Sequence, residues 1–145
     1  MFSKSCKYGL RATIYLSHQP HQDFISLSHI ADELNIPFHF LTKVMQKLKK
    51  AGIIESRRGS VGGIRLAEPE RNISLFSIIN AIKEKDDLLE SCFLGFPRCN
   101  LESPCPYHEQ WREMTESINN VLKNIHLNSF KKSTAENFIN KKEKV

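Results

Sequence analysis

The segment from Cys92 to His108, CFLGFPRCNLESPCPYH, carries the residue types of this chain that are best suited to binding a metal. Three of the four cysteines lie in it, separated by six and then five residues, and His108 follows Cys105 after two more. Cysteines in such an arrangement can form disulfides, pack as small apolar side chains, or bind a metal together with the imidazole. The segment contains no CxxC motif, which disfavours a thiol oxidoreductase.

The composition narrows these alternatives. The 145 residues are 40% apolar and 26% charged, which is typical of a single globular domain. No apolar run approaches the roughly 18 residues of a membrane span. The start of the chain, MFSKSCKYGLRATIYL, lacks the apolar core and cleavage site of a signal peptide, so we expect a cytoplasmic protein without membrane contact. Thiols are normally reduced there, so burial or metal binding is favoured over a disulfide framework.

The net charge of +5 is concentrated in one short stretch. Residues 40–65 contain seven basic side chains and one acidic side chain, whereas the rest of the chain carries a slight negative charge. A concentrated basic patch is typical of a protein that binds a polyanion, most often nucleic acid. On charge alone, a solvated helix face explains the same pattern.

The elements around the basic stretch favour nucleic acid. We expect a first helix at 3–18, a short second helix capped by Ser26, and a third helix at about 37–50 that ends before Gly52. Phe40 or Leu41 would face inward in the third helix, together with Val44, Met45 and Leu48, and its outer face would carry His39, Thr42, Lys43, Gln46, Lys47 and Lys50. Two short helices joined by a tight turn form a helix-turn-helix, although a helical hairpin that merely packs has the same pattern.

A predicted hairpin follows, with strands at 53–57 and 64–67. Its turn is rich in glycine, which permits close approach of the backbone to a ligand, and is flanked by Arg57, Arg58 and Arg65. Such a hairpin would be the wing of a winged helix, able to clamp phosphates or enter a minor groove. A nucleotide-binding loop is disfavoured, because neither GxGxxG nor GxxxxGK[ST] is present.

Two more helices frame the cysteine segment. Ser74 is expected to cap a helix at 75–84. After the cysteines, apolar residues recur at spacings of three and four, as in a coiled-coil seam: Trp111, Met114, Ile118, Val121 or Leu122, and Ile125. This stripe could pack on the chain's own core, but a dimer helix is favoured because DNA-binding modules commonly read two half-sites. The last fifteen residues are polar and are expected to be flexible.

The sequence resembles the IscR/NsrR/CymR family of bacterial winged-helix transcription regulators. The resemblance runs from KYGLRATIYL through ISLSHIADELNIPFHFLTKVMQKLKKAGIIESRRGSVGGIRLA to WREMTESINNVLKNIHL, and RGSVGGIRLA is its most specific part. It implies a mainly α fold with a small β-hairpin: a winged helix-turn-helix domain at 1–86, a cysteine-rich loop at 87–108, a long C-terminal dimerisation helix at 107–130 and a flexible tail at 131–145.

The resemblance also implies a homodimer on a palindromic operator in double-stranded DNA, with no enzymatic activity. The DNA-binding residues would be Phe38, His39, Thr42, Lys43, Gln46, Lys47, Arg57, Arg58, Gly59, Ser60, Gly62, Gly63 and Arg65. Dimerisation would use Trp111, Met114, Ile118, Val121, Leu122 and Ile125. Thr42 stands where IscR has a glutamate that helps set its site preference, so the operator of IscR does not transfer to this chain.

IscR-like members hold a 2Fe–2S cluster through three cysteines and a histidine, which implies Cys92, Cys99, Cys105 and His108 as ligands here. Relatives similar to NsrR hold a 4Fe–4S cluster with an acidic residue just before the YGL motif, where this chain has Lys7. A 2Fe–2S cluster is therefore favoured, and cluster-assembly proteins are further candidate partners.

Cluster supply, redox state or nitric oxide would then control operator affinity. Two alternatives use the same residues. A structural zinc fits the same ligand set, and a metal-free winged-helix module could act through thiol sensing or protein partners.

Overall fold

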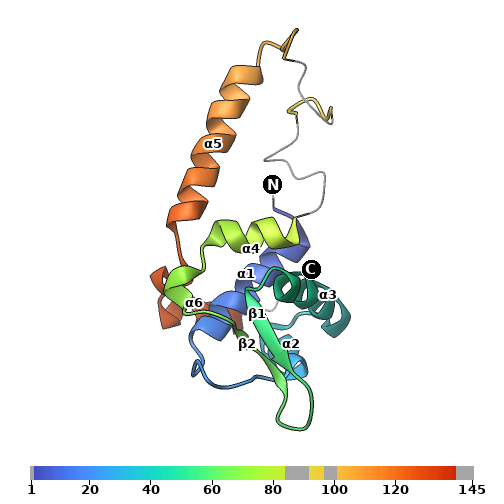
Figure 1. Ribbon diagram of the computed structural model, residues 1–145, viewed down its shortest axis with the longest axis vertical. Coiled ribbons are helices and arrows are strands. Elements are labelled where there is room, and N and C mark those ends of the chain that lie inside the picture. The colour runs from blue at the N-terminus through green and yellow to red at the C-terminus, as the bar shows by residue number, and fades with distance from the viewer. Residues whose placement is uncertain (1, 84–91, 97–100, 140–145) are drawn as a thin grey trace.

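The computed structural model describes residues 2–83, 92–96 and 101–139, and of residues 138 and 139 it describes the backbone alone. A helical body carries a β-hairpin at one end, and a long helix, α5, projects from the other (Figure 1). The elements, in chain order, are α1 (Lys4–Ser17), α2 (Leu27–Leu34), α3 (Phe38–Lys50), β1 (Ile54–Arg57), β2 (Gly63–Leu66), η1 (Glu70–Asn72), α4 (Leu75–Ile82), α5 (His108–Asn124), η2 (Leu127–Ser129) and α6 (Lys132–Ile139). No helix in the described ranges is long and apolar enough to cross a membrane.

Local capping signals fix the ends of the first helices. The side chains of Ser3 and Ser26 accept hydrogen bonds from backbone amides three residues ahead and start α1 and α2. Asn35 ends α2 in a left-handed conformation (φ 52°), and Gly52, with φ 75°, follows the end of α3. The tight turn between α2 and α3 confirms the predicted helix-turn-helix.

The third helix buries one face and exposes the other, as its sequence predicts. Leu41 is fully buried and Phe40 is 45% exposed, so Leu41 is the inward residue of that pair. Val44, Met45 and Leu48 share the buried face. Burial of this apolar stripe against α1 and α4 orients the polar face of α3 outward.

The predicted wing is present as the antiparallel pair β1–β2, in which Ile54 pairs with Leu66 and Arg57 with Gly63. The hairpin is anchored on the body by a bridge between Ile25 and Ile64, whose backbone groups exchange hydrogen bonds of 2.9 and 2.8 Å. The wing is therefore a rigid extension of the loop between α1 and α2.

Helix α4 packs into the centre of the body. Ser74 caps it, as predicted, by accepting a hydrogen bond from the amide of Ser77 at 3.1 Å. Its last residue, Ile82, is fully buried against α1 and α3. A Cβ on Gly9 of α1 would overlap Cδ1 of Ile82 and press on Val44, so the absence of a side chain at Gly9 allows this approach.

The C-terminal part of the chain corrects two expectations. The helix predicted at 107–130 ends at Asn124, because the chain turns back to the body: the amide of Leu75 donates to the Ile125 carbonyl (2.9 Å), and Leu127 is fully buried. The segment expected to be flexible forms α6 instead, which contacts α1 and α2 and buries Ala135. The polar composition of this segment gave no sequence signal for the short helix. Residues 140–145 lie outside the described part.

Candidate DNA interface and metal centre

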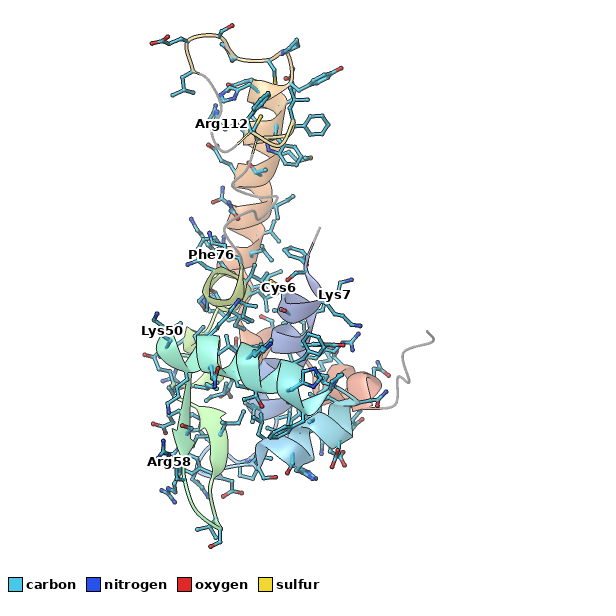
Figure 2. All side chains as sticks on the ribbon, turned by 90° about the vertical axis from the view of Figure 1, so that its right-hand side faces the viewer. Cys6, Lys7, Lys50, Arg58, Phe76 and Arg112 are labelled. Atoms are coloured by element: carbon cyan, nitrogen blue, oxygen red, sulfur yellow. The ribbon has the colours of Figure 1, made fainter. Side chains whose placement is uncertain are left out.

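The outer face of α3 carries the predicted base-reading side chains. Figure 2 looks onto this helix, with Lys50 at one end and the hairpin, labelled at Arg58, below it. His39, Lys43 and Gln46 are exposed, and Phe38 is 53% exposed at the start of the helix. Such side chains can reach base edges when a helix lies in a major groove.

Thr42 has a restricted role on this face. Its hydroxyl donates to the Phe38 carbonyl at 2.8 Å, so the hydroxyl proton is already committed within the helix. The oxygen can still accept a hydrogen bond from a base amino group, and the methyl group can contact a thymine methyl.

Lys47 differs from its neighbours on α3. Its Nζ donates to the carbonyl of Ile82 at 3.2 Å, which joins α3 to the C-terminal end of α4. From the sequence, Lys47 is expected to point outward without such a partner. The residues of α3 give no indication of an acceptor that lies 35 residues later in the chain.

The basic residues of the wing are held by an aromatic side chain that sequence reasoning missed. The guanidinium groups of Arg57 and Arg65 both lie 4.3 Å from the ring centroid of Phe24. Arg65 also pairs with Glu55 and donates to the Gln22 carbonyl at 2.9 Å. Only the long-range Ile25–Ile64 bridge brings Phe24 under the hairpin, so no local signal could have identified it.

The glycines of the wing have different local surroundings, and their role as points of ligand approach stays a prediction. Gly59 has φ 108° and open space around its Cα, whereas a Cβ on Gly62 would overlap the Arg57 carbonyl and one on Gly63 would overlap the Ile25 carbonyl. Gly62 and Gly63 thus allow backbone segments of this chain to pack together. Gly59, exposed Ser60 and exposed Arg58 form the tip that is open to a partner.

The described candidate metal ligands, Cys92, Cys105 and His108, lie in the segments next to the start of α5. The amide of His108 donates to the Cys105 carbonyl at 3.1 Å, so these residues share the turn that starts the helix. The ring of Phe93 lies 5.3 Å from that of Trp111 and 5.9 Å from that of Tyr107, which brings the segment of Cys92 to the same turn. Cys92 is 8% exposed and Cys105 is half-buried.

The imidazole of His108 is the feature of this region that points to a ligand. Its Nδ1 is buried and makes no hydrogen bond to any described residue. Such an atom is costly unless a partner satisfies it. Within the described ranges no three metal-binding side chains meet, and Cys99 lies outside them. Two thiols and an unpartnered imidazole nevertheless form a donor set of the kind that iron–sulfur clusters and zinc prefer.

Arg112, labelled in Figure 2 near the top of α5, pairs with the carboxylates close to His108. Arg112 donates to Glu109 and, at 2.7 Å, to Glu116. The hydrogen bond from Arg112 to Glu109 and the charge of Arg112, with a smaller effect of His108, lower the pKa of Glu109. The carboxylate therefore stays ionised beside His108, where its negative charge favours a cation.

The apolar residues of α5 fall into two groups, one packed on the core and one exposed. Leu122 is buried and Ile118 packs against the core of the chain itself, while Met114 (46% exposed) and Val121 (57% exposed) face outward. Ile125, predicted to be part of the helix, follows its last residue. The half-buried Trp111 packs on Phe93 instead of extending the seam.

Comparison with known proteins identifies the relatives of this chain. The family model "Rrf2: Iron-dependent Transcriptional regulator" matches residues 2–133. The transcriptional regulator IscR of Vibrio campbellii is 29% identical over 126 residues, which cover 87% of this chain and 74% of that protein. The solved structure of T. potens IscR has a TM-score of 0.71 at 26% identity, covering 88% of this chain and 83% of that one. The oxidized form of Staphylococcus aureus CymR has a TM-score of 0.68 at 32% identity, covering 88% and 92%. The family resemblance inferred from the sequence is thus confirmed, and the chain belongs to the Rrf2 family of transcriptional regulators, which bind DNA and are not enzymes.

Proposed function

We propose that this regulator binds its operator with an affinity controlled by an iron–sulfur cluster held by Cys92, Cys99, Cys105 and His108. The observation that carries the proposal is the buried, unpartnered Nδ1 of His108 in the turn that also contains Cys105. The packing of Phe93 on Trp111 supports it, because that contact holds the segment of Cys92 beside the same turn.

A bound cluster would supply one-electron redox chemistry and sensitivity to oxidants and nitric oxide. Three thiolates and a neutral imidazole favour the 2Fe–2S type. The exposed Lys7 argues in the same direction, because a cationic side chain cannot replace the acidic fourth ligand of the 4Fe–4S relatives.

The chain links the ligand segment to the DNA-reading face through helices. The start of α5 carries His108, and its other end packs on α4, where the Nζ of Lys123 lies 4.8 Å from the ring centroid of Phe76. Helix α4 in turn packs on α1 and α3. A change in how the ligand segment holds the start of α5 can therefore alter the placement of α3, and with it the operator affinity.

We further propose a homodimer that reads a palindromic operator. The outward side chains of α5, Met114 and Val121, form an apolar surface on a helix that projects from the body (Figure 1). Pairing two such helices would bury this surface and set two α3 helices for successive half-sites.

The test compares DNA binding by three forms of the chain under anaerobic conditions. A fluorescent duplex, selected by the protein from a random-sequence library, is titrated with protein as purified, reconstituted with iron and sulfide, or stripped with an iron chelator. We expect the affinities of the reconstituted and stripped forms to differ by about tenfold or more. Equal affinities would refute control by the cluster.

The metal content separates the alternative from the proposal. A colourless protein that contains one zinc per chain and binds no duplex would identify a zinc-stabilised module for protein contacts. The same donor set suits zinc, so metal analysis accompanies the titration.

A further inference from the structure

Three of the four exposed lysines of α3 share one side of the helix and are indistinguishable in sequence but not in structure. Lys43, Lys47 and Lys50 follow one another at spacings of four and three, so they occupy neighbouring positions on one side of the helix. Sequence reasoning assigns them the same electrostatic role. The hydrogen bond from Lys47 to the carbonyl of Ile82 sets one of them apart.

The acceptor of this bond is at a special place in the fold. Ile82 is the last residue of α4, and the last turn of α4 contains no basic residue of its own. Carbonyl groups at the end of a helix lack intrahelical partners and carry a partial negative charge. Lys47 therefore supplies from α3 a hydrogen-bond donor and a positive charge at the end of α4, where the C-cap residue is Lys83.

The side chain of Ile82 also connects the end of α4 to α3, through apolar packing. It is fully buried, and it fits between α1 and α3 where Gly9 and Val44 approach it. The end of α4 is thus fixed to α3 twice, by apolar packing and by the ammonium of Lys47. In both views α4 lies above α3 (Figures 1 and 2), and the two helices are in contact.

We propose that Lys47 is a positioning residue that fixes the recognition helix on the end of α4, and not a contact to a DNA phosphate. Lys43 stays a candidate phosphate contact, and we assign the same role to the exposed Lys50 on the same side of α3. Because α4 also packs on α5, this bond lies where a movement of α4 would be transmitted to the DNA-reading face. The inference rests on the proposed DNA binding. The contact between Lys47 and the end of α4 can nevertheless be tested without DNA.

The experiment compares Lys47→Met with Lys50→Met, a matched loss of one charge on the same helix. Binding to a duplex selected by the wild-type protein is measured between about 50 and about 200 mM salt. For Lys50→Met we expect the slope of log K against log salt to fall by about 0.9, the value for one lost phosphate contact. For Lys47→Met we expect affinity to fall about tenfold with the slope unchanged, because the helix is displaced while every phosphate contact remains.

Hydrogen exchange of the unbound proteins gives the second readout. The amide of Lys83 donates to the Ile79 carbonyl at 2.8 Å in the last turn of α4. This amide should exchange faster in Lys47→Met and at the wild-type rate in Lys50→Met. A slope that falls by about 0.9 in Lys47→Met, or an unchanged exchange rate at Lys83, would overturn the inference. Wild-type protein that binds no duplex in a salt-dependent way would instead refute the proposed function, while the exchange comparison would still decide whether Lys47 holds α4.

Discussion

Replacing Gly63 by alanine should detach the wing from the body. A Cβ at this position would overlap the carbonyl oxygen, the carbonyl carbon and the following amide of Ile25 and Ser26. These are backbone atoms, so they cannot rotate away as a flexible side chain would. The clash falls on the pair of hydrogen bonds, 2.9 and 2.8 Å long, that Ile25 and Ile64 exchange.

The expected cost has two parts. Placing a non-glycine residue at φ 155° costs on the order of 1–3 kcal/mol. Losing the two backbone hydrogen bonds adds about 1 kcal/mol each. The total is roughly 3–5 kcal/mol, a large part of the 5–15 kcal/mol that stabilises a typical domain.

Gly59→Ala is the matched control. Gly59 also has a positive φ, of 108°, but nothing lies within contact distance of a Cβ there, so only the backbone cost applies. Urea unfolding followed by circular dichroism gives the free energy of unfolding of both variants. We expect Gly63→Ala to lose about 2 kcal/mol more than Gly59→Ala. Equal losses would show that the close approach of Gly63 to Ile25 does not hold the wing.

Three further predictions concern separate parts of the chain. Arg58→Ala, at the exposed tip of the wing, should lower the salt slope of DNA binding by about 0.9, and an unchanged slope would remove this side chain from the interface. Val121→Asp should convert the proposed dimer to a folded monomer in sedimentation. Leu122→Ala should instead cost about 2–5 kcal/mol of stability through a core cavity, and the reverse result would mean that the exposed face of α5 is misassigned. His18→Ala removes a ring whose nitrogens lie 3.0 Å from the Ile14 carbonyl and 2.9 Å from the Phe130 carbonyl. The amides of α6 should therefore exchange faster, and unchanged exchange would contradict this link between α1 and the C-terminal segment.

The sequence was sufficient where the determining interactions are local. Ser26 and Ser74 cap their helices through amides three residues away, and Gly52 ends α3 with the positive φ that glycine permits. The buried stripe of α3 follows from helical periodicity. These signals lie within one or two turns of the residue concerned, so they could be read before any tertiary contact was known.

The sequence was insufficient where distant segments meet. Phe24 lies under the wing arginines only because Ile25 pairs with Ile64, and Lys47 meets Ile82 across 35 residues. The helical pattern of the dimer segment continued to 130, yet the extended backbone at Ile125 pairs with α4 and ends the helix earlier. The resemblance to IscR implied the candidate ligand set, whereas the buried Nδ1 of His108 could be found only in the folded chain.

The ligand set is tested most directly by the visible absorption spectrum of anaerobically reconstituted protein, with iron, sulfide and zinc analysis of the same sample. Wild-type protein and Cys6→Ser, in which a buried cysteine of the α1 core is changed, should both be coloured and contain iron and sulfide in a ratio of about one. Cys105→Ser should lose the colour, and His108→Ala should shift the spectrum or lose it, because the imidazole would no longer be a ligand. A wild-type protein that stays colourless after reconstitution, or a His108→Ala spectrum identical to that of the wild type, would contradict the account.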